Sequence, residues 1–371
     1  ISPSNKNLIA EFQEMLWQFQ GDSESIENLL KHPLSDALFY FFKNFPIPYC
    51  EEHIHLTGSL TPEFIWEHME PLLKGKNKDL YINKIREVYG DNTISINNTQ
   101  DVLDLIQLKP HEEFSRYLTI LYLPKLILRD RLIHEYSAYH MARTLYEEYN
   151  VGSIRLKFTL SRSTGIESEK IPGLENITEE DVVLGLYSGF MKYKNENQLF
   201  DFTLTPSFRK ESAFYDQAKF NSKKEHFQHQ VAMIKGIIAK YPFLKSKLCE
   251  VDTVGDEKKL FKKSHFEEMK EGFRKLQYLG FKIKSHHGET WNILRTGVQS
   301  VDNAMNIWHI DTLEHGISLG INPNFYFHRI YQHVLELNLR SEKIQKNSLY
   351  HRELDDMNWE DIRIRDKLLD G

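Results

Sequence analysis

The feature that most constrains the fold is a regular alternation of strand-like and helix-like segments between residues 150 and 315. Six segments are predicted to be strands: 50–56, 151–158, 199–204, 248–254, 281–285 and 310–314. Helical patterns separate the later ones, at 178–193, 223–240, 264–279 and 298–306. Strands that alternate with helices form βα units around a parallel sheet. The sequence therefore predicts an α/β fold, with the eight-stranded (β/α) barrel of the TIM type as its natural closure.

The same pattern divides the chain into three parts. Residues 1–48 are predicted to be an N-terminal helical segment, and residues 49–321 to be the barrel with its first six strands. Residues 322–371 contain a helical pattern and a polar end, which we interpret as an insertion or a truncated C-terminal segment. We find no further barrel strand there. We therefore expect the last strands to be missing from this chain, or to come from a second chain or fragment that completes the barrel.

Composition excludes several other classes of protein. Of 371 residues, 40% are hydrophobic and 27% are charged, which allows a large buried core and excludes general disorder. Two cysteines form no disulfide framework, and we find no apolar run long enough to cross a membrane. A net charge of −6 argues against a nucleic-acid binder that works through bulk charge. We expect a cytoplasmic protein, with assembly into a homo-oligomer left open.

Two histidines on the first predicted strand are candidates for metal ligands. His53 and His55 are two residues apart, so on a strand both imidazoles lie on the same face. Such a pair can converge on one divalent ion such as zinc. The alternative interpretation is a pair of polar residues on a half-exposed strand. The position at the start of the βα units favours the metal, because active sites of parallel barrels lie at the carboxyl ends of the strands.

Three later strand ends carry further candidates. In the segment SHHGE, we expect His286 to face inward as a ligand, His287 to face the surrounding helices, and Glu289 to move protons. At the end of the next strand, His315 is a candidate for binding metal or orienting a bound water. Gly255 follows the predicted strand 248–254, where a glycine exposes its backbone N–H to a ligand. The alternative interpretations are a polar loop for the segment SHHGE, a buried hydrogen-bonded histidine for His315 and an ordinary turn glycine for Gly255.

The order of these motifs resembles the adenosine and AMP deaminase family. The resemblance runs through HIHLTGS at 53–59, GDE at 255–257, HHGE at 286–289 and HG at 315–316, and covers roughly residues 45 to 320. It implies one zinc ion held by His53, His55 and His286, with Glu289 as the proton donor to the purine. It also implies that His315 orients the attacking hydroxide and that Gly255 binds the purine through its backbone. The product would be the inosine form, with release of ammonia.

The sequence departs from that family at two points. Adenosine deaminases usually have an aspartate that contacts the sugar where this chain has Thr57, so adenine nucleotides are considered beside free adenosine. The Asp-Asp pair that supplies the family's last ligand is not found, because Asp355–Asp356 follows no strand pattern. Two alternatives therefore stay open. One is a degenerate deaminase-like scaffold or nucleotide-sensing subunit of a larger, antiphage-type assembly, and the other is a different single-metal amidohydrolase.

Overall fold

The computed structural model describes residues 3–19, 23–91, 95–109, 112, 114–160, 173–174 and 177–356. Two compact units divide the chain, Ile1–Leu204 and Thr205–Gly371. The strands are β1 (Tyr49–His55), β2 (Val151–Thr159), β3 (Asp201–Arg209), β4 (Glu250–Val254), β5 (Lys282–His287) and β6 (Thr312–His315). The division falls within β3, so each unit is described by itself. The predicted boundaries after residues 48 and 321 stay predictions.

The six strands form one sheet in which their order follows the chain, β1-β2-β3-β4-β5-β6. The pairs β1/β2, β3/β4, β4/β5 and β5/β6 are parallel. This confirms the α/β class and the six predicted strands. The eight strands of a closed barrel are not shown, since six are found among the described residues.

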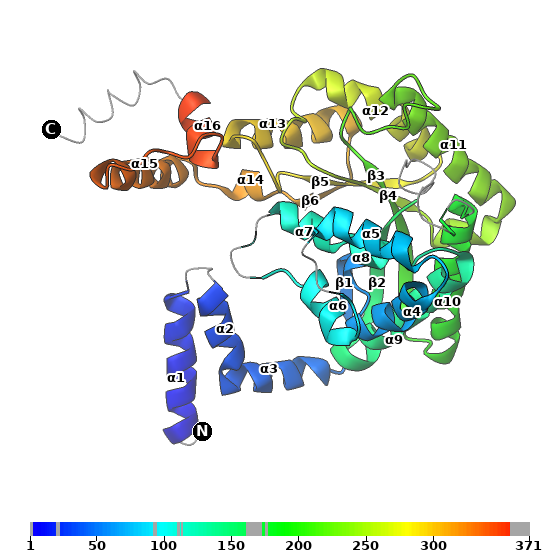
Figure 1. Ribbon diagram of the computed structural model, residues 1–371, viewed down its shortest axis with the longest axis horizontal. Helices are drawn as coiled ribbons and strands as arrows, with labels where there is room; N and C mark the ends of the chain where they lie inside the picture. The colour runs from blue at the N-terminus through cyan, green and yellow to red at the C-terminus, as the bar shows by residue number, and fades with distance from the viewer. Residues whose placement is uncertain are drawn as a thin grey trace. The chain divides into compact units, whose positions relative to one another are not determined.

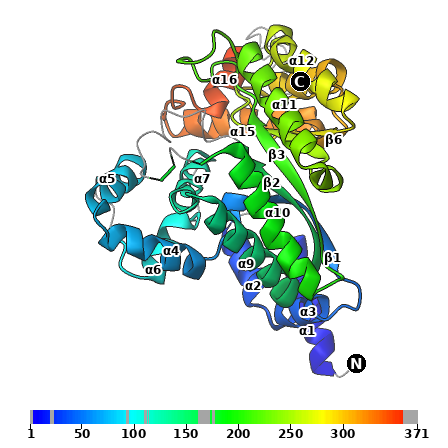
Figure 2. The same cartoon turned by 90° about the vertical axis from the view of Figure 1, so that its right-hand side faces the viewer.

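In the first unit, helices precede β1, connect β1 to β2 and follow β2. They are α1 (Pro3–Trp17), α2 (Ser23–Lys31), α3 (Pro33–Lys43), η1 (Leu56–Gly58), α4 (Pro62–Lys74), α5 (Lys78–Tyr89), α6 (Thr99–Ile106), α7 (Phe114–Ile120), α8 (Tyr122–Lys125), α9 (Arg131–Tyr149) and α10 (Glu179–Glu196). A capping box starts α10, because the Asp181 amide donates to Thr178 Oγ1 at 3.1 Å and the Thr178 amide donates to Asp181 Oδ2 at 3.1 Å. Helices α9 and α10 lie side by side (Figure 2).

The second unit continues the alternation after β3. Its helices are α11 (Lys223–Lys240), η3 (Pro242–Ser246), α12 (Lys263–Tyr278), α13 (Leu294–Asn303), η4 (Ala304–Trp308), α14 (Ile317–Gly320), α15 (Pro323–Leu339) and α16 (Leu349–Asp356). Helices α11 and α12 lie side by side (Figure 1). They pack together through Phe227 and Phe273, whose ring centroids are 4.8 Å apart. Phe208 of β3 lies 5.0 Å from the Phe227 ring, so the same aromatic layer joins helices to sheet.

One strand is longer than the sequence pattern predicts. The pattern places an end at residue 204, just before Pro206, yet β3 continues to Arg209. Residues 207–209 pair with 252–254 of β4. Proline fixes φ near −65°, which extended backbone accommodates, so Pro206 lies within the strand without ending it. In the described part of the chain, none of the helices has the length and apolar character that crossing a bilayer requires.

Candidate metal centre

In the first unit, β1 brings two imidazoles together as the period of a strand predicts. Nε2 of His53 lies 3.2 Å from Nε2 of His55, and both side chains are half-buried. Nitrogens bound to a tetrahedral zinc at about 2.0–2.1 Å lie about 3.3 Å from each other. The spacing therefore suits two ligands of one ion, as well as a hydrogen bond between a donor and an acceptor nitrogen.

In the second unit, a buried carboxylate orients His286 at the end of β5. Nδ1 of His286 lies 3.0 Å from Oδ1 of Asp252 on β4, and Asp252 has 0% of its surface exposed. Ser207 of β3 donates from Oγ to the other carboxylate oxygen at 3.4 Å. An ionised carboxylate accepts a hydrogen bond from Nδ1–H, so the imidazole keeps Nε2 as its electron-pair donor. Metal-ligating histidines are commonly held in this way.

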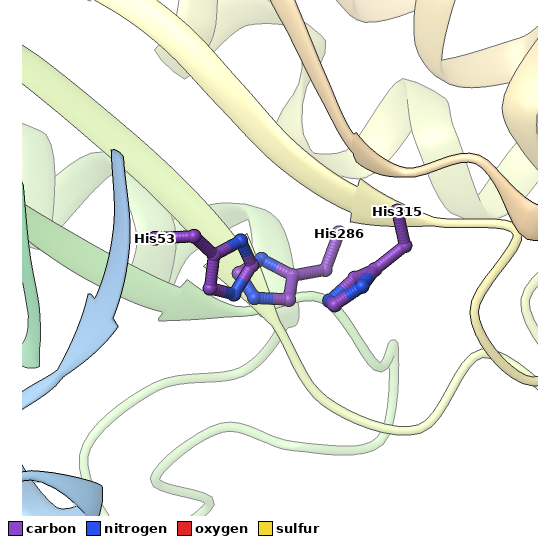
Figure 3. A group of neighbouring side chains, drawn as sticks. All are labelled: His53, His286 and His315. Atoms are coloured by element: carbon purple, nitrogen blue, oxygen red, sulfur yellow. The ribbon is translucent and has the colours of Figure 1, made fainter. Parts of the chain in front are cut away.

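His315 and Glu289 lie beside His286 in the same unit. The ring centroids of His286 and His315 are 5.0 Å apart (Figure 3). His315 Nε2 lies 3.7 Å from Oε1 of Glu289, so a carboxyl group and an imidazole lie close enough to interact electrostatically. The parallel register of β5 and β6 brings them together by pairing His287 with His315 and His286 with Glu314. Two imidazoles and a carboxyl group thus lie together at the ends of β5 and β6.

His287 faces the helices, as its position next to His286 predicts. Its Nδ1 lies 2.8 Å from Ser300 Oγ of α13, and its ring packs 5.6 Å from Phe266 and 5.4 Å from Trp308. Burial, followed by the charge of Lys210, lowers the pKa of His287 to about 4. The ring is therefore neutral at pH 7 and belongs to the packing behind the site.

The structure gives a reason for a glycine at position 255 that the sequence does not reveal. Its φ is +116°, and a Cβ there would lie 2.2 Å from Oε2 of Glu211. Oε1 of Glu211 accepts the Asp256 amide at 3.0 Å, so the carboxylate fills the space that a side chain would need. A purine contact by the Gly255 amide stays a prediction, as does a sugar or phosphate contact by Thr57, which lies half-buried in η1.

Three aspartates, at positions 252, 355 and 356, are not among the ligands predicted from the sequence. Asp252 was missed by sequence reasoning, although an aspartate inside the apolar strand pattern VDTV is a signal of a buried carboxylate with a specific partner. Asp355–Asp356 ends α16 instead of following a strand, and Asp356 Oδ2 accepts from Arg295 Nε at 3.1 Å. This placement agrees with the interpretation that the pair is not the missing family motif.

The comparisons with known proteins give a limited result. No protein-family model matches the sequence, and neither does any curated protein. Among solved structures, the chain is similar to the crystal structure of an adenine deaminase from Arthrobacter aurescens. The identity is 11% and the TM-score 0.47, over 77% of this chain and 70% of that chain. Such an identity and score do not identify a family, a substrate or a metal.

Proposed function

We propose that this chain is a zinc-dependent hydrolase that deaminates an adenine nucleoside or nucleotide to its inosine form and ammonia. Pairs of imidazoles at strand ends carry the proposal. Nε2 of His53 lies 3.2 Å from Nε2 of His55 in the first unit, and the ring centroids of His286 and His315 are 5.0 Å apart in the second. Neutral imidazole nitrogens are good ligands for zinc, and the contact of Nδ1 with Asp252 favours the tautomer in which Nε2 of His286 carries the electron pair. The residues therefore fit one zinc ion per chain.

His53, His55 and His286 are the proposed ligands, and the deaminase-like motifs HIH and HHGE support this assignment. The 3.2 Å separation of the two β1 nitrogens suits a shared ion. In the second unit, His315 lies beside His286, and its Nε2 is 3.7 Å from Oε1 of Glu289. Its proposed role is to orient the water that attacks the ring.

Bound zinc lowers the pKa of a coordinated water to about 7 and so supplies hydroxide at neutral pH. The chain must then manage two protons. The ring nitrogen beside C6 takes a proton as C6 gains oxygen, and the amino group takes one before it leaves as ammonia. In the proposed mechanism Glu289, in its acid form, would give its proton to the ring nitrogen. His315, 3.7 Å away, would orient the attacking water, take the proton that this water loses and pass it to the amino group. As ammonia leaves, the proton of the new C6 hydroxyl would return to Glu289, which restores the acid.

Two residues bear on which substrate the site takes. Thr57 lies two residues after His55, in the turn at the carboxyl end of β1, and it is neutral. An aspartate there would repel a phosphate, whereas threonine does not. The proposal therefore includes AMP and ATP beside adenosine, with the Gly255 amide as a proposed contact to the purine.

The test is metal analysis combined with turnover on adenosine, AMP and ATP, followed by the change in adenine absorbance and by ammonia release. We expect one zinc per chain and conversion of at least one substrate to inosine, IMP or ITP. Removing zinc with a chelator abolishes the conversion, and adding zinc restores it. Stoichiometric zinc without turnover on any of the three would overturn the proposal in favour of a scaffold or nucleotide sensor.

A further inference from the structure

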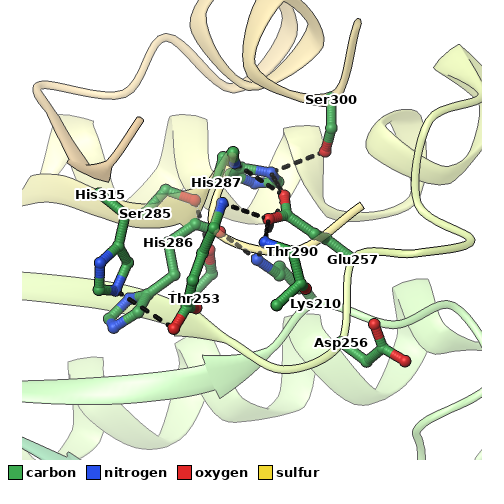
Figure 4. A network of polar contacts seen from close by, with 12 residues as sticks. Lys210, Thr253, Asp256, Glu257, Ser285, His286, His287, Thr290, Ser300 and His315 are labelled. Carbon is green, nitrogen blue, oxygen red and sulfur yellow. Dashed lines mark hydrogen bonds and ion pairs between the residues drawn. The ribbon is translucent and has the colours of Figure 1, made fainter. Parts of the chain in front are cut away.

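The backbone that carries Glu289 is tied to the buried side chain of Glu257. Oε2 of Glu257 accepts the Gly288 amide at 3.0 Å, and Oε1 accepts the amides of Glu289 at 2.6 Å and Thr290 at 2.7 Å (Figure 4). Three consecutive amides thus converge on one carboxylate. Successive N–H groups arranged in this way form an anion-binding nest, and here the anion is a side chain of the same chain.

The carboxylate of Glu257 is held in its charged form by its surroundings. Its oxygen Oε2 lies 3.9 Å from Nζ of Lys210 and 3.3 Å from Nδ1 of His287, in a place where the side chains of Glu257 and Lys210 are almost completely buried. Burial alone would raise the pKa of Glu257, but the hydrogen bond with His287 and the charge of Lys210 hold it at about 2. Lys210 Nζ also donates to the backbone oxygen of His286. The buried Lys210–Glu257 pair therefore hydrogen-bonds the backbone both before and after His287.

Gly288 gives the loop the bend that this convergence requires. Its φ is +69°, in the left-handed region that favours glycine, and a Cβ there would lie 2.6 Å from Ser318 Oγ. Ser318 donates its amide to the Gly288 oxygen at 2.9 Å. The loop is therefore fixed on one side by α14 and on the other by Glu257.

We propose that Glu257 is a positioning residue, whose carboxylate fixes the backbone of residues 288–290 so that the Glu289 carboxyl meets the purine ring. This inference rests on the proposed role of Glu289 as proton donor. Glu257 itself touches no substrate. Because a catalytic group displaced by about 1 Å can lose about 100-fold in rate, the hydrogen bonds made by Glu257 are expected to control kcat more than binding.

The first test follows the three amides directly, by hydrogen exchange of the peptide that contains residues 288–290. In the wild-type chain we expect the backbone amides of residues 288–290 to be protected from exchange. Glu257→Gln should remove that protection, because the side-chain amide of glutamine cannot accept three N–H hydrogen bonds as a carboxylate does. The matched control is Glu250→Gln. Glu250 is also a buried glutamate, and its Oε2 lies 3.9 Å from a buried lysine, Lys284.

The second test measures turnover on whichever adenine substrate the wild-type chain converts. We expect Glu257→Gln to lower kcat about 100-fold. The KM should stay within about threefold and the zinc content should be unchanged, since a group acting only in the transition state affects kcat selectively. Glu257→Asp keeps the charge on a shorter side chain and should restore part of kcat. A kcat no lower than that of Glu250→Gln would overturn the inference.

Two further outcomes keep this inference separate from the proposed function. If Glu257→Gln fails to fold, the inference is tested with Glu257→Asp and with the exchange rates of the wild-type chain. Unprotected amides at 288–290 in the wild-type chain would overturn the inference. If the wild-type chain turns over none of the three substrates, the proposed function fails. The hydrogen-exchange comparison of Glu257→Gln with Glu250→Gln then still decides whether Glu257 fixes the loop.

Discussion

Nδ1 of His286 lies 3.0 Å from Oδ1 of Asp252, a carboxylate with no exposed surface, on the neighbouring parallel strand. A buried carboxylate needs charged or hydrogen-bonding partners to offset its lost hydration. Asp252 finds them in the His286 imidazole and the Ser207 hydroxyl. The same contact fixes the tautomer and the ring orientation of His286, so one interaction both stabilises the buried carboxylate and orients the proposed zinc ligand.

Replacing this carboxylate should weaken metal binding. We expect Asp252→Asn to reduce zinc affinity about 10- to 100-fold, because the neutral amide holds the imidazole less strongly. Competition with a chelator of known affinity measures the change. Asp256→Asn, at an exposed aspartate four residues later, is the control and should leave the affinity unaltered. Equal affinities for the Asp252 variant and the wild-type chain would show that Asp252 does not support a ligand.

Removing the proposed proton donor should separate metal binding from turnover. Glu289→Gln keeps the shape of the side chain and loses its acid, so we expect the zinc content to persist and kcat to fall about 100- to 10,000-fold. Glu267→Gln, at an exposed glutamate on α12, serves as the control. An unimpaired rate in the Glu289 variant would remove this residue from the mechanism.

A side chain at position 255 should destabilise the second unit. In Gly255→Ala, the positive φ costs about 1–3 kcal/mol in the free energy of unfolding, and the new Cβ also displaces the Glu211 carboxylate. Gly280→Ala is the matched control, since φ there is +88° but nothing lies within 4 Å of the new Cβ. Unfolding in urea should show the larger loss for Gly255→Ala. Equal losses would mean that Glu211 moves aside without cost.

His226 on α11 should make stability depend on pH. Burial, then the charge of Lys223, lowers the pKa of His226 from 6.5 to about 4, with Asp216, His229 and Lys219 also acting on it. The folded state favours the neutral ring, so its contribution is complete above pH 6.5 and is lost as the pH falls towards about 4.

We therefore expect the wild-type chain to lose about 2 kcal/mol more unfolding free energy than His226→Gln between about pH 7 and about pH 4.5. Urea unfolding at several pH values measures the difference. The control is His328→Gln, at an exposed position on α15, which should follow the wild-type curve. Parallel curves for wild type and His226→Gln would contradict the assignment.

Local signals account for much of the fold. Helix α11 spans Lys223–Lys240, the predicted range, because Ser222 caps its start by accepting the Glu225 amide and an apolar stripe runs along its length. Strand β3 shows the limit of such signals. A proline at 206 interrupts the apolar pattern, whereas pairing with β4 decides that the strand continues to Arg209.

For the site, the pattern of the sequence by itself determined which faces of the strands carry imidazoles: His53 and His55 on one side of β1, and His286 and His287 on opposite sides of β5. Strand geometry makes that a local property. Only the tertiary structure decided that Asp252 supports His286, that Glu211 fills the space beside Gly255, and that Glu257 gathers the amides of residues 288–290. These are contacts between residues 31 to 45 positions apart, and they depend on strand register and helix packing, which no short stretch of sequence encodes.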